Sequence, residues 1–172
     1  NVVCYQAWFG KGKFNSQHLT KYIDFFNSLD CSEIKENYFE SIYAGKYFSK
    51  NDALKIGFVR DYIADLVKKK KINQREESIL IASLMYATDK IANTVGHFEH
   101  FLSKKPEDKG VFMRQLRIKG GSSSLIYNED ANALVKKVQC DVAYIDPPYN
   151  ARQYINFYHV LENLVRWEKP KE

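Results

Sequence analysis

The sequence DVAYIDPPYN, residues 141–150, is the stretch from which the fold of this chain can be inferred. Its first half, 141–145, is a nearly continuous apolar run with the length of a buried strand. Its second half, DPPYN, follows directly, and a pair of prolines cannot continue a central strand. In open α/β sheets, ligands bind just beyond the carboxyl ends of the strands. The stretch therefore predicts a buried strand with a functional motif at its end.

The residues around this stretch extend the pattern. A short strand is predicted at 125–127 and a helical segment at 131–137. Strand, helix and strand in close succession form a βαβ unit, which implies parallel pairing. From Arg152 the pattern is helical again, with apolar residues on one face. We therefore expect an α/β fold, in which residues 119–172 are part of a doubly wound catalytic domain whose partner strands lie outside this chain.

Residues 1–118 are mainly helical in pattern. Apolar residues recur at helical spacing in 16–29, in the segment that follows 49–52, and in 74–102, where Gly96 is a candidate break. The polar residues 49–52 offer side-chain oxygens that suit a helix start. Only residues 2–5 read as strand-like. We expect 1–118 to form a mainly helical region, separate from 119–172.

Composition sets the broad class. The chain has 172 residues, a formal net charge of +5, 45% hydrophobic residues and 15% aromatic residues. These values are typical of a globular protein, and a basic chain rich in aromatics is compatible with nucleic-acid binding. No run is long and apolar enough to span a membrane, and no signal-peptide pattern is present. The chain begins with Asn1 rather than Met, so we expect a fragment.

Cysteine and histidine usage points away from disulfides and metals. Cys4, Cys31 and Cys140 are odd in number and far apart, which favours free thiols in a reducing cytoplasm. The four histidines make no zinc signature, because His97 and His100 lack a third ligand at suitable spacing. No metal site is predicted.

The DPPYN motif suits methylation of an exocyclic amine on a planar base. The carboxylate of Asp146 and the backbone carbonyl of Pro147 can each accept one hydrogen bond from such an amine, which frees the nitrogen lone pair for attack. The Pro147-Pro148 pair fixes φ and removes two N–H donors. Tyr149 offers a ring that can stack on a base taken out of the helix. The structural alternative is a Pro-Pro turn with Tyr149 in the core.

At this point the sequence resembles a known family. DPPYN and the helix after it look like motif IV of the Dam-type adenine DNA methyltransferases, which include the modification enzymes of type II restriction systems. The segments 47–53, 58–63 and 86–96 are similar to segments that these enzymes carry upstream of motif IV. The resemblance implies S-adenosylmethionine as methyl donor, N6 of a flipped adenine as acceptor, and double-stranded DNA as partner. It also implies a Rossmann-like sheet with a mainly helical target-recognition insertion, a cognate restriction endonuclease, and a cytoplasmic location.

The resemblance and the residue chemistry together give the predicted site. The catalytic residues are Asp146, Pro147, Pro148 and Tyr149, and the donor-binding residues are Asp130 and Asp146. The predicted DNA contacts are Tyr149, Asn150 and Tyr154, together with Arg114, Arg117 and Lys119 beside the Gly120-Gly121 loop, because arginine can read guanine edges and loops carry such contacts. For Asp130 the alternative is a helix N-cap.

Several readings stay open. The family's glycine-rich donor loop is imitated at 8–12, but a basic hairpin or connecting loop is favoured there. Lysines 68–71 either contact phosphates or form a solvated helix end, and the second is favoured. Asn93 and His97 are expected in the core. The alternative functions are a non-catalytic DNA-binding remnant that lacks the donor site, and an amino-methyltransferase acting on RNA or cytosine. Asp146 favours adenine in DNA, since the other amino-methyltransferases commonly carry Asn or Ser at that motif position.

Overall fold

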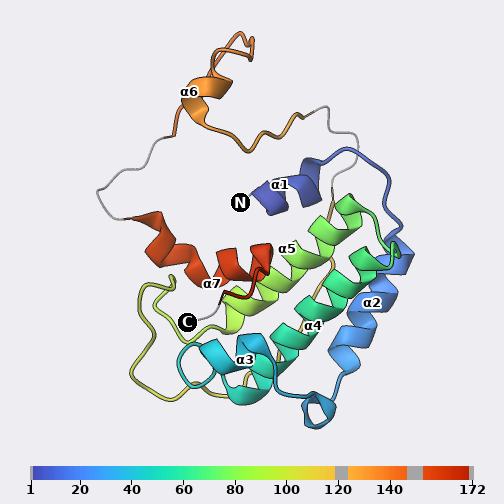
Figure 1. The fold of residues 1–172 in the computed structure, drawn as a ribbon, viewed down its shortest axis with the longest axis vertical. Helices are drawn as coiled ribbons and strands as arrows, with labels where there is room; N and C mark the ends of the chain where they lie inside the picture. Colours follow the sequence, from blue (N-terminus) through green and yellow to red (C-terminus); the bar gives the residue numbers. More distant parts are fainter. Residues whose placement is uncertain (1, 119–123, 147–152, 171–172) are drawn as a thin grey trace.

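The structure is a computed structural model that describes residues 2–118, 124–146 and 153–170. Its elements follow the chain as helices joined by loops (Figure 1). They are α1 (Val2–Phe9), α2 (Ser16–Ser28), the 3-10 turn η1 (Cys31–Glu33), α3 (Tyr38–Tyr43), α4 (Lys50–Lys68), α5 (Gln74–Ile91), α6 (Ala131–Leu134) and α7 (Tyr154–Arg166). In the described ranges no helix is both long and apolar enough to cross a bilayer.

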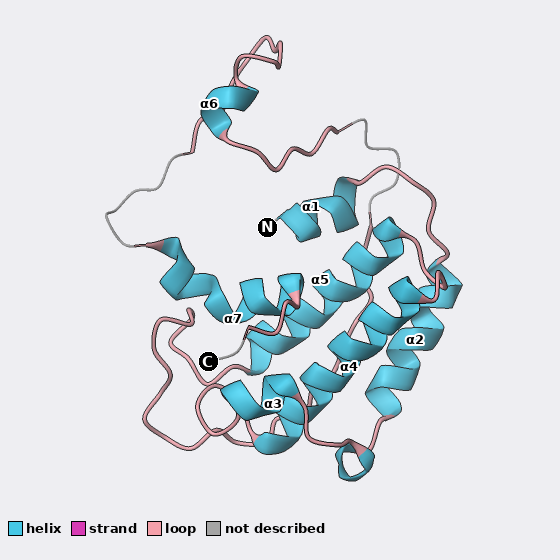
Figure 2. Cartoon of the chain, viewed as in Figure 1, coloured by secondary structure: helices cyan, strands magenta, loops and turns pink. Residues whose placement is uncertain are grey.

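The predicted α/β fold is wrong for the part of the chain that the structure describes. Those residues contain helices and loops (Figure 2), and their only β-type pairings are two isolated bridges, 44 with 48 and 94 with 101. The predicted Rossmann-like sheet is therefore not seen. The physical reason lies in pairing, since a strand must satisfy its backbone N–H and C=O groups on a neighbour.

The two predicted strands illustrate this. Residues 125–127 and 141–146 are loop, and the side chains of Val142, Tyr144 and Ile145 are 85%, 89% and 81% exposed. A run of apolar residues sets a preference for extended backbone, but no strand lies beside this one in the described residues. The predicted helix at 131–137 is shorter, and α6 ends at Leu134.

The predicted helices of the N-terminal region are largely confirmed, and their starts follow from side-chain caps. Ser49 Oγ accepts a hydrogen bond from the Asp52 N–H at 3.0 Å, as the polar segment predicted. Asn73 and Glu76 form a capping box at the start of α5. Two details differ: α5 ends at Ile91 and a loop covers 92–102, and residues 2–5 belong to a helix.

The core lies around α4 and α5, which run side by side through the centre of the molecule (Figure 1). Helix α1 packs on α5 through Val3 and Ala7, α3 packs on α4, and α7 packs on α5. Gly57 allows one close approach, because a Cβ there would meet Asn37 Oδ1 at 1.9 Å. The helical region therefore has a continuous core, and α7 belongs to it although it lies after the DPPYN motif.

Candidate functional site

The predicted catalytic motif is described only at its first residue. Asp146 lies at the exposed end of the loop 141–146. Pro147, Pro148, Tyr149 and Asn150 lie outside the described residues, as does Lys119. The roles assigned to these residues stay predictions. What the structure does describe is the helix that follows the motif and the body that holds it.

Helix α7 begins at Tyr154, four positions after Asn150. Its apolar face includes Val160 and Leu164, both 0% exposed. Tyr154, a predicted DNA contact, is 43% exposed, and its ring lies parallel to that of Tyr158 with the centroids 6.2 Å apart. The first turns of α7 therefore present aromatic surface at the end nearest the motif.

The carboxyl end of α7 is held by Arg60 of α4. The Arg60 guanidinium donates from Nε to the Leu164 carbonyl at 2.7 Å and from Nη2 to the Val165 carbonyl at 3.0 Å. It also lies over the Trp167 ring, 5.4 Å from the centroid. Arg60 is buried, and burial lowers its pKa from the ordinary value. The last carbonyls of a helix have no partner within the helix, so a cation there satisfies them.

Two further contacts fix the same end. Asn163 Nδ2 donates to the hydroxyls of Tyr38 and Tyr43 at 2.8 and 2.7 Å, which ties α7 to α3. Trp167, in left-handed backbone just after the helix, donates from Nε1 to Asp61 at 2.8 Å. The helix after the motif is thus joined to both α3 and α4.

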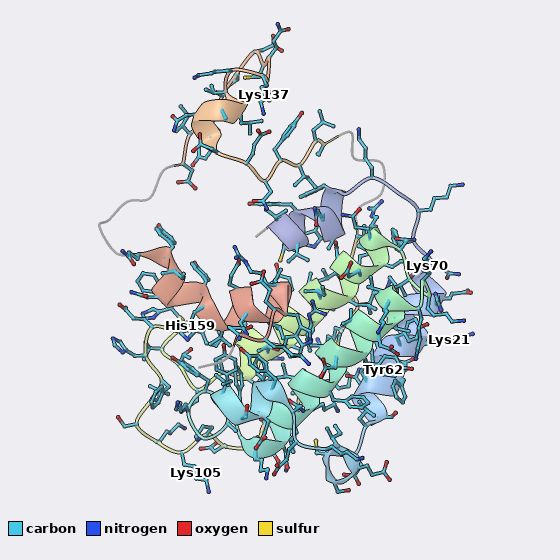
Figure 3. The ribbon with its side chains drawn as sticks, viewed as in Figure 1. Lys21, Tyr62, Lys70, Lys105, Lys137 and His159 are labelled. Carbon is cyan, nitrogen blue, oxygen red and sulfur yellow. The ribbon has the colours of Figure 1, made fainter. Side chains whose placement is uncertain are left out.

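The first half of α7 is held by the loop 92–102. The Phe98 N–H donates to the Phe157 carbonyl at 3.0 Å, and the Tyr47 hydroxyl donates to the Phe98 carbonyl at 2.8 Å. The His97 ring packs edge-on against Phe157, with the centroids 4.8 Å apart. His159, labelled on α7 in Figure 3, packs edge-on against the Tyr47 ring, with the centroids 5.7 Å apart. Burial raises the pKa of Tyr47, so its hydroxyl stays a donor at neutral pH.

Asn93 closes that loop. It is 3% exposed, and its Nδ2 lies 3.0–3.1 Å from three backbone carbonyls, those of Lys46, Leu102 and Lys104. The prediction that Asn93 belongs to the core is confirmed. The roles of Arg60, Asn163 and the loop were missed from the sequence. The available signal was Arg60 itself, a charge within an apolar helical pattern.

Asp130, the predicted donor-binding residue, caps α6. Its Oδ1 accepts a hydrogen bond from the Ala133 N–H at 3.0 Å. Asp130 is exposed, and α6 stands apart from the helical body in Figure 1. The N-cap reading is therefore confirmed. A carboxylate has several acceptor sites, so capping leaves acceptor capacity, and the donor-binding role remains a prediction.

Arg114 and Arg117, the described members of the predicted loop contacts, line one groove. The groove has a volume of about 630 Å³ and lies between the second half of α5 and the segment 109–117. Lys90 and Lys109 line it as well. The sequence placed the two arginines together but did not show that α5 would complete their surroundings.

The region 8–12, which imitates a donor loop, is the end of α1 and the connection to α2, in agreement with the favoured reading. Cys4, Cys31 and Cys140 are free thiols, as predicted. In the described ranges, no group of three or more His, Cys, Asp or Glu side chains could hold a metal ion.

Comparison with known proteins relates the whole chain to one family. The family model that describes D12 class N6 adenine-specific DNA methyltransferases matches residues 1–172. The chain is 33% identical over 153 residues to the modification methylase StsI of Streptococcus sanguinis, covering 85% of this chain and 23% of that protein. It is 38% identical over 130 residues to the type II methyltransferase M.FokI of Planomicrobium okeanokoites, covering 73% of this chain and 20% of that protein.

A third relative, the type II methyltransferase M.NlaIII of Neisseria lactamica, is 35% identical over 126 residues, covering 72% of this chain and 38% of that protein. The chain thus spans between about one fifth and two fifths of the length of these relatives. No solved structure matches it.

Proposed function

Because the chain belongs to the D12 class of N6 adenine-specific DNA methyltransferases, we propose that the protein methylates N6 of a flipped-out adenine at a specific site in double-stranded DNA. The observation that carries the proposal is the DPPYN motif, set directly before a helix in a chain that matches the family over its full length. The methyl donor is S-adenosylmethionine, which supplies an electrophilic methyl group on a sulfonium centre. The printed names of the relatives support a role as the modification enzyme of a restriction system, beside a cognate endonuclease in the cytoplasm.

The roles of the motif follow from its chemistry. The amino group of adenine is a poor nucleophile, because its lone pair is delocalised into the ring. The Asp146 carboxylate accepts one of its hydrogens and the Pro147 carbonyl accepts the other, which draws the nitrogen toward tetrahedral geometry. Tyr149 stacks on the flipped base, and Asn150 and Tyr154 contact the DNA beside it. Fixed acceptors aimed at the reacting nitrogen contribute through positioning and electrostatics.

The residues that would hold the donor are carboxylates. Asp130 and Asp146 are both exposed in the structure, and carboxylate oxygens suit the amino groups and the positive charge of this donor. Asp130 accepts one backbone hydrogen bond and keeps acceptor sites for the amino group of the donor's adenine. The residues present therefore fit the donor.

The proposal is tested by replacing Asp146 with alanine and with asparagine. Both changes remove a charged acceptor, and we expect methyl transfer from a labelled donor to DNA to fall by at least about 100-fold, the scale for loss of one electrostatic stabiliser. Asp141→Ala is the matched control, because Asp141 is an exposed carboxylate on the same loop and has no assigned role. If Asp146→Ala transfers methyl groups at the rate of Asp141→Ala, the catalytic assignment is wrong.

A further inference from the structure

The groove beside α5 collects positive charge. Lys90 on α5 and Lys109, Arg114 and Arg117 on the following segment line it, and no acidic side chain is among its described lining residues. The chain as a whole carries 26 basic and 21 acidic residues, so acidic residues are nearly as common as basic ones elsewhere. In the described part of the chain, no ion pair joins Lys90, Arg114 or Arg117 to a carboxylate. The groove is therefore a local concentration of uncompensated cations.

The segment that carries the arginines is extended and alternates along its length. Val111 and Met113 are buried at 3% and 1%, whereas Phe112 is 62% exposed and Arg114 is also exposed. This period of two turns Phe112 and Arg114 to the outer face.

The backbone of this segment is tied to α2. The Met113 N–H donates to Asn27 Oδ1 at 2.8 Å, and Asn27 Nδ2 donates back to the Met113 carbonyl at 2.9 Å. Gln115 bonds to Ser16 and Thr20 at 2.9 and 2.8 Å. The groove wall is thus held from two points, so its cations project from a fixed support.

Two exposed aromatic rings accompany the charge. Phe112 is 62% exposed and Tyr86 is 46% exposed, and both line the groove. The Arg114 guanidinium lies over the Phe112 ring, 5.9 Å from the centroid. An arginine beside an exposed ring offers a charge for a phosphate and a flat apolar face for a sugar or base.

We propose that this groove binds the sugar-phosphate backbone of double-stranded DNA at a distance from the target adenine, with Lys90, Arg114 and Arg117 on phosphates and Phe112 and Tyr86 against the deoxyribose. The inference rests on the proposed function for the identity of the nucleic acid, and it deepens that function by assigning a backbone contact to α5 and the segment 109–117. Lys109 has a structural task, because its Nζ donates to the Ile91 carbonyl at the end of α5 at 3.0 Å.

The position of the groove determines which kinetic constant it affects. Ser83, Ala87 and Lys90 of α5 line the groove, whereas Glu77, Ile81 and Met85 line a separate cavity shared with α7. At 3.6 residues per turn these two sets lie on nearly opposite sides of α5. The groove therefore lies away from the helix that follows the motif, so its cations act on DNA affinity rather than on the methyl-transfer step.

The test is DNA binding by the K90Q/R114Q/R117Q variant of the protein, measured by fluorescence anisotropy with a labelled duplex at several salt concentrations. Each phosphate contact contributes about 0.9 to the slope of log K against log[salt]. If all three cations contact phosphates, the slope falls by about 2.7, and affinity at 0.1 M salt falls by about eight-fold per contact. In methylation assays the same variant should show a raised KM for DNA, and its deficit should shrink as DNA approaches saturation.

The matched control is K68Q/K70Q/K71Q, which makes the same change in net charge at the end of α4, where Figure 3 labels Lys70. We expect the control to keep the salt slope, and R114K/R117K to keep it too because charge is retained. An unchanged slope in K90Q/R114Q/R117Q, or an equal fall in the control, would overturn the proposal. The binding assay needs no methyl donor, so its result is independent of whether Asp146→Ala abolishes methylation.

Discussion

Replacing Arg60 with methionine should selectively release the carboxyl end of α7. The change removes two hydrogen bonds, at 2.7 and 3.0 Å, from a charged donor to the Leu164 and Val165 carbonyls. Hydrogen bonds to charged groups contribute about 1.5–3 kcal/mol each, so their sum is about 3–6 kcal/mol. Burial lowers the pKa of Arg60, which shows that its charge carries a desolvation cost in the fold. Methionine removes that cost and fills part of the volume, so we expect a net loss of about 3 kcal/mol.

For a chain of this length a loss of about 3 kcal/mol lowers Tm by about 6–12 °C. Thermal unfolding followed by circular dichroism gives the size of the effect, and amide hydrogen exchange gives its location. In Arg60→Met the amides of α7 should lose protection ahead of those of α2 and α4, because the carbonyl end of α7 is then left without its partner.

Arg75→Met is the control for a general effect of losing a packed arginine. Arg75 Nη1 donates to the Gly12 carbonyl at 2.6 Å and the guanidinium lies 5.0 Å from the Phe14 centroid, so it anchors the α1–α2 connection instead. We expect Arg75→Met to reduce stability without selective exchange in α7. If both variants show the same pattern of exchange, Arg60 is not a specific anchor of α7 and the reasoning is refuted.

Three other perturbations have definite expected outcomes. Asn93→Ala removes the donor shared by three backbone carbonyls and should cost about 2–3 kcal/mol in urea unfolding, whereas a surface Asn→Ala change should cost under about 0.5 kcal/mol. Tyr47→Phe removes the donor to the Phe98 carbonyl and should cost about 1–2 kcal/mol at pH 8. Because burial raises the Tyr47 pKa, its contribution is present below its unfolded value of about 10 and is lost as pH rises through the higher folded value, so wild type and variant should converge in stability at alkaline pH. Thiol labelling at pH 8 should find one fast cysteine, the exposed Cys140, and three after denaturation, since burial raises the pKa of the other two thiols; three equally fast thiols would contradict this.

The sequence predicted those parts of the fold that depend on neighbouring residues. The helices at Ser16–Ser28, Lys50–Lys68 and Gln74–Ile91 follow from apolar spacing and from caps such as Ser49, both of which act within a few residues. The strand at 141–145 was wrong because a strand depends on a partner, and an apolar pattern does not supply one. Residues 2–5 are β-branched in part, yet Val3 packs on α5 and the segment is helical.

The same distinction applies to the candidate site. The DPPYN motif is local, so spacing alone pointed to its chemistry. The anchors of α7 are long-range: Arg60 meets a carbonyl 104 residues away, and Asn163 meets the Tyr38 hydroxyl 125 residues away. Nothing in the local pattern at Arg60 shows where its partner lies. The groove needed the structure for the same reason, because Lys90 and Arg114 come together only through the packing of the segment 109–117.

These contacts bear on how recognition and catalysis are connected. The region expected to recognise DNA and the helix that follows the motif share one core, and α7 is bonded to α3, α4 and the loop 92–102. Only a few residues separate Asn150 from Tyr154, and an extended residue spans at most about 3.6 Å, so the motif cannot lie far from the first turn of α7. Any shift of α7 on the helical body is therefore passed to the motif through a short link. It follows that substitutions at Arg60 or Asn163 will change methyl transfer without touching substrate, whereas substitutions in the α5 groove will change DNA affinity.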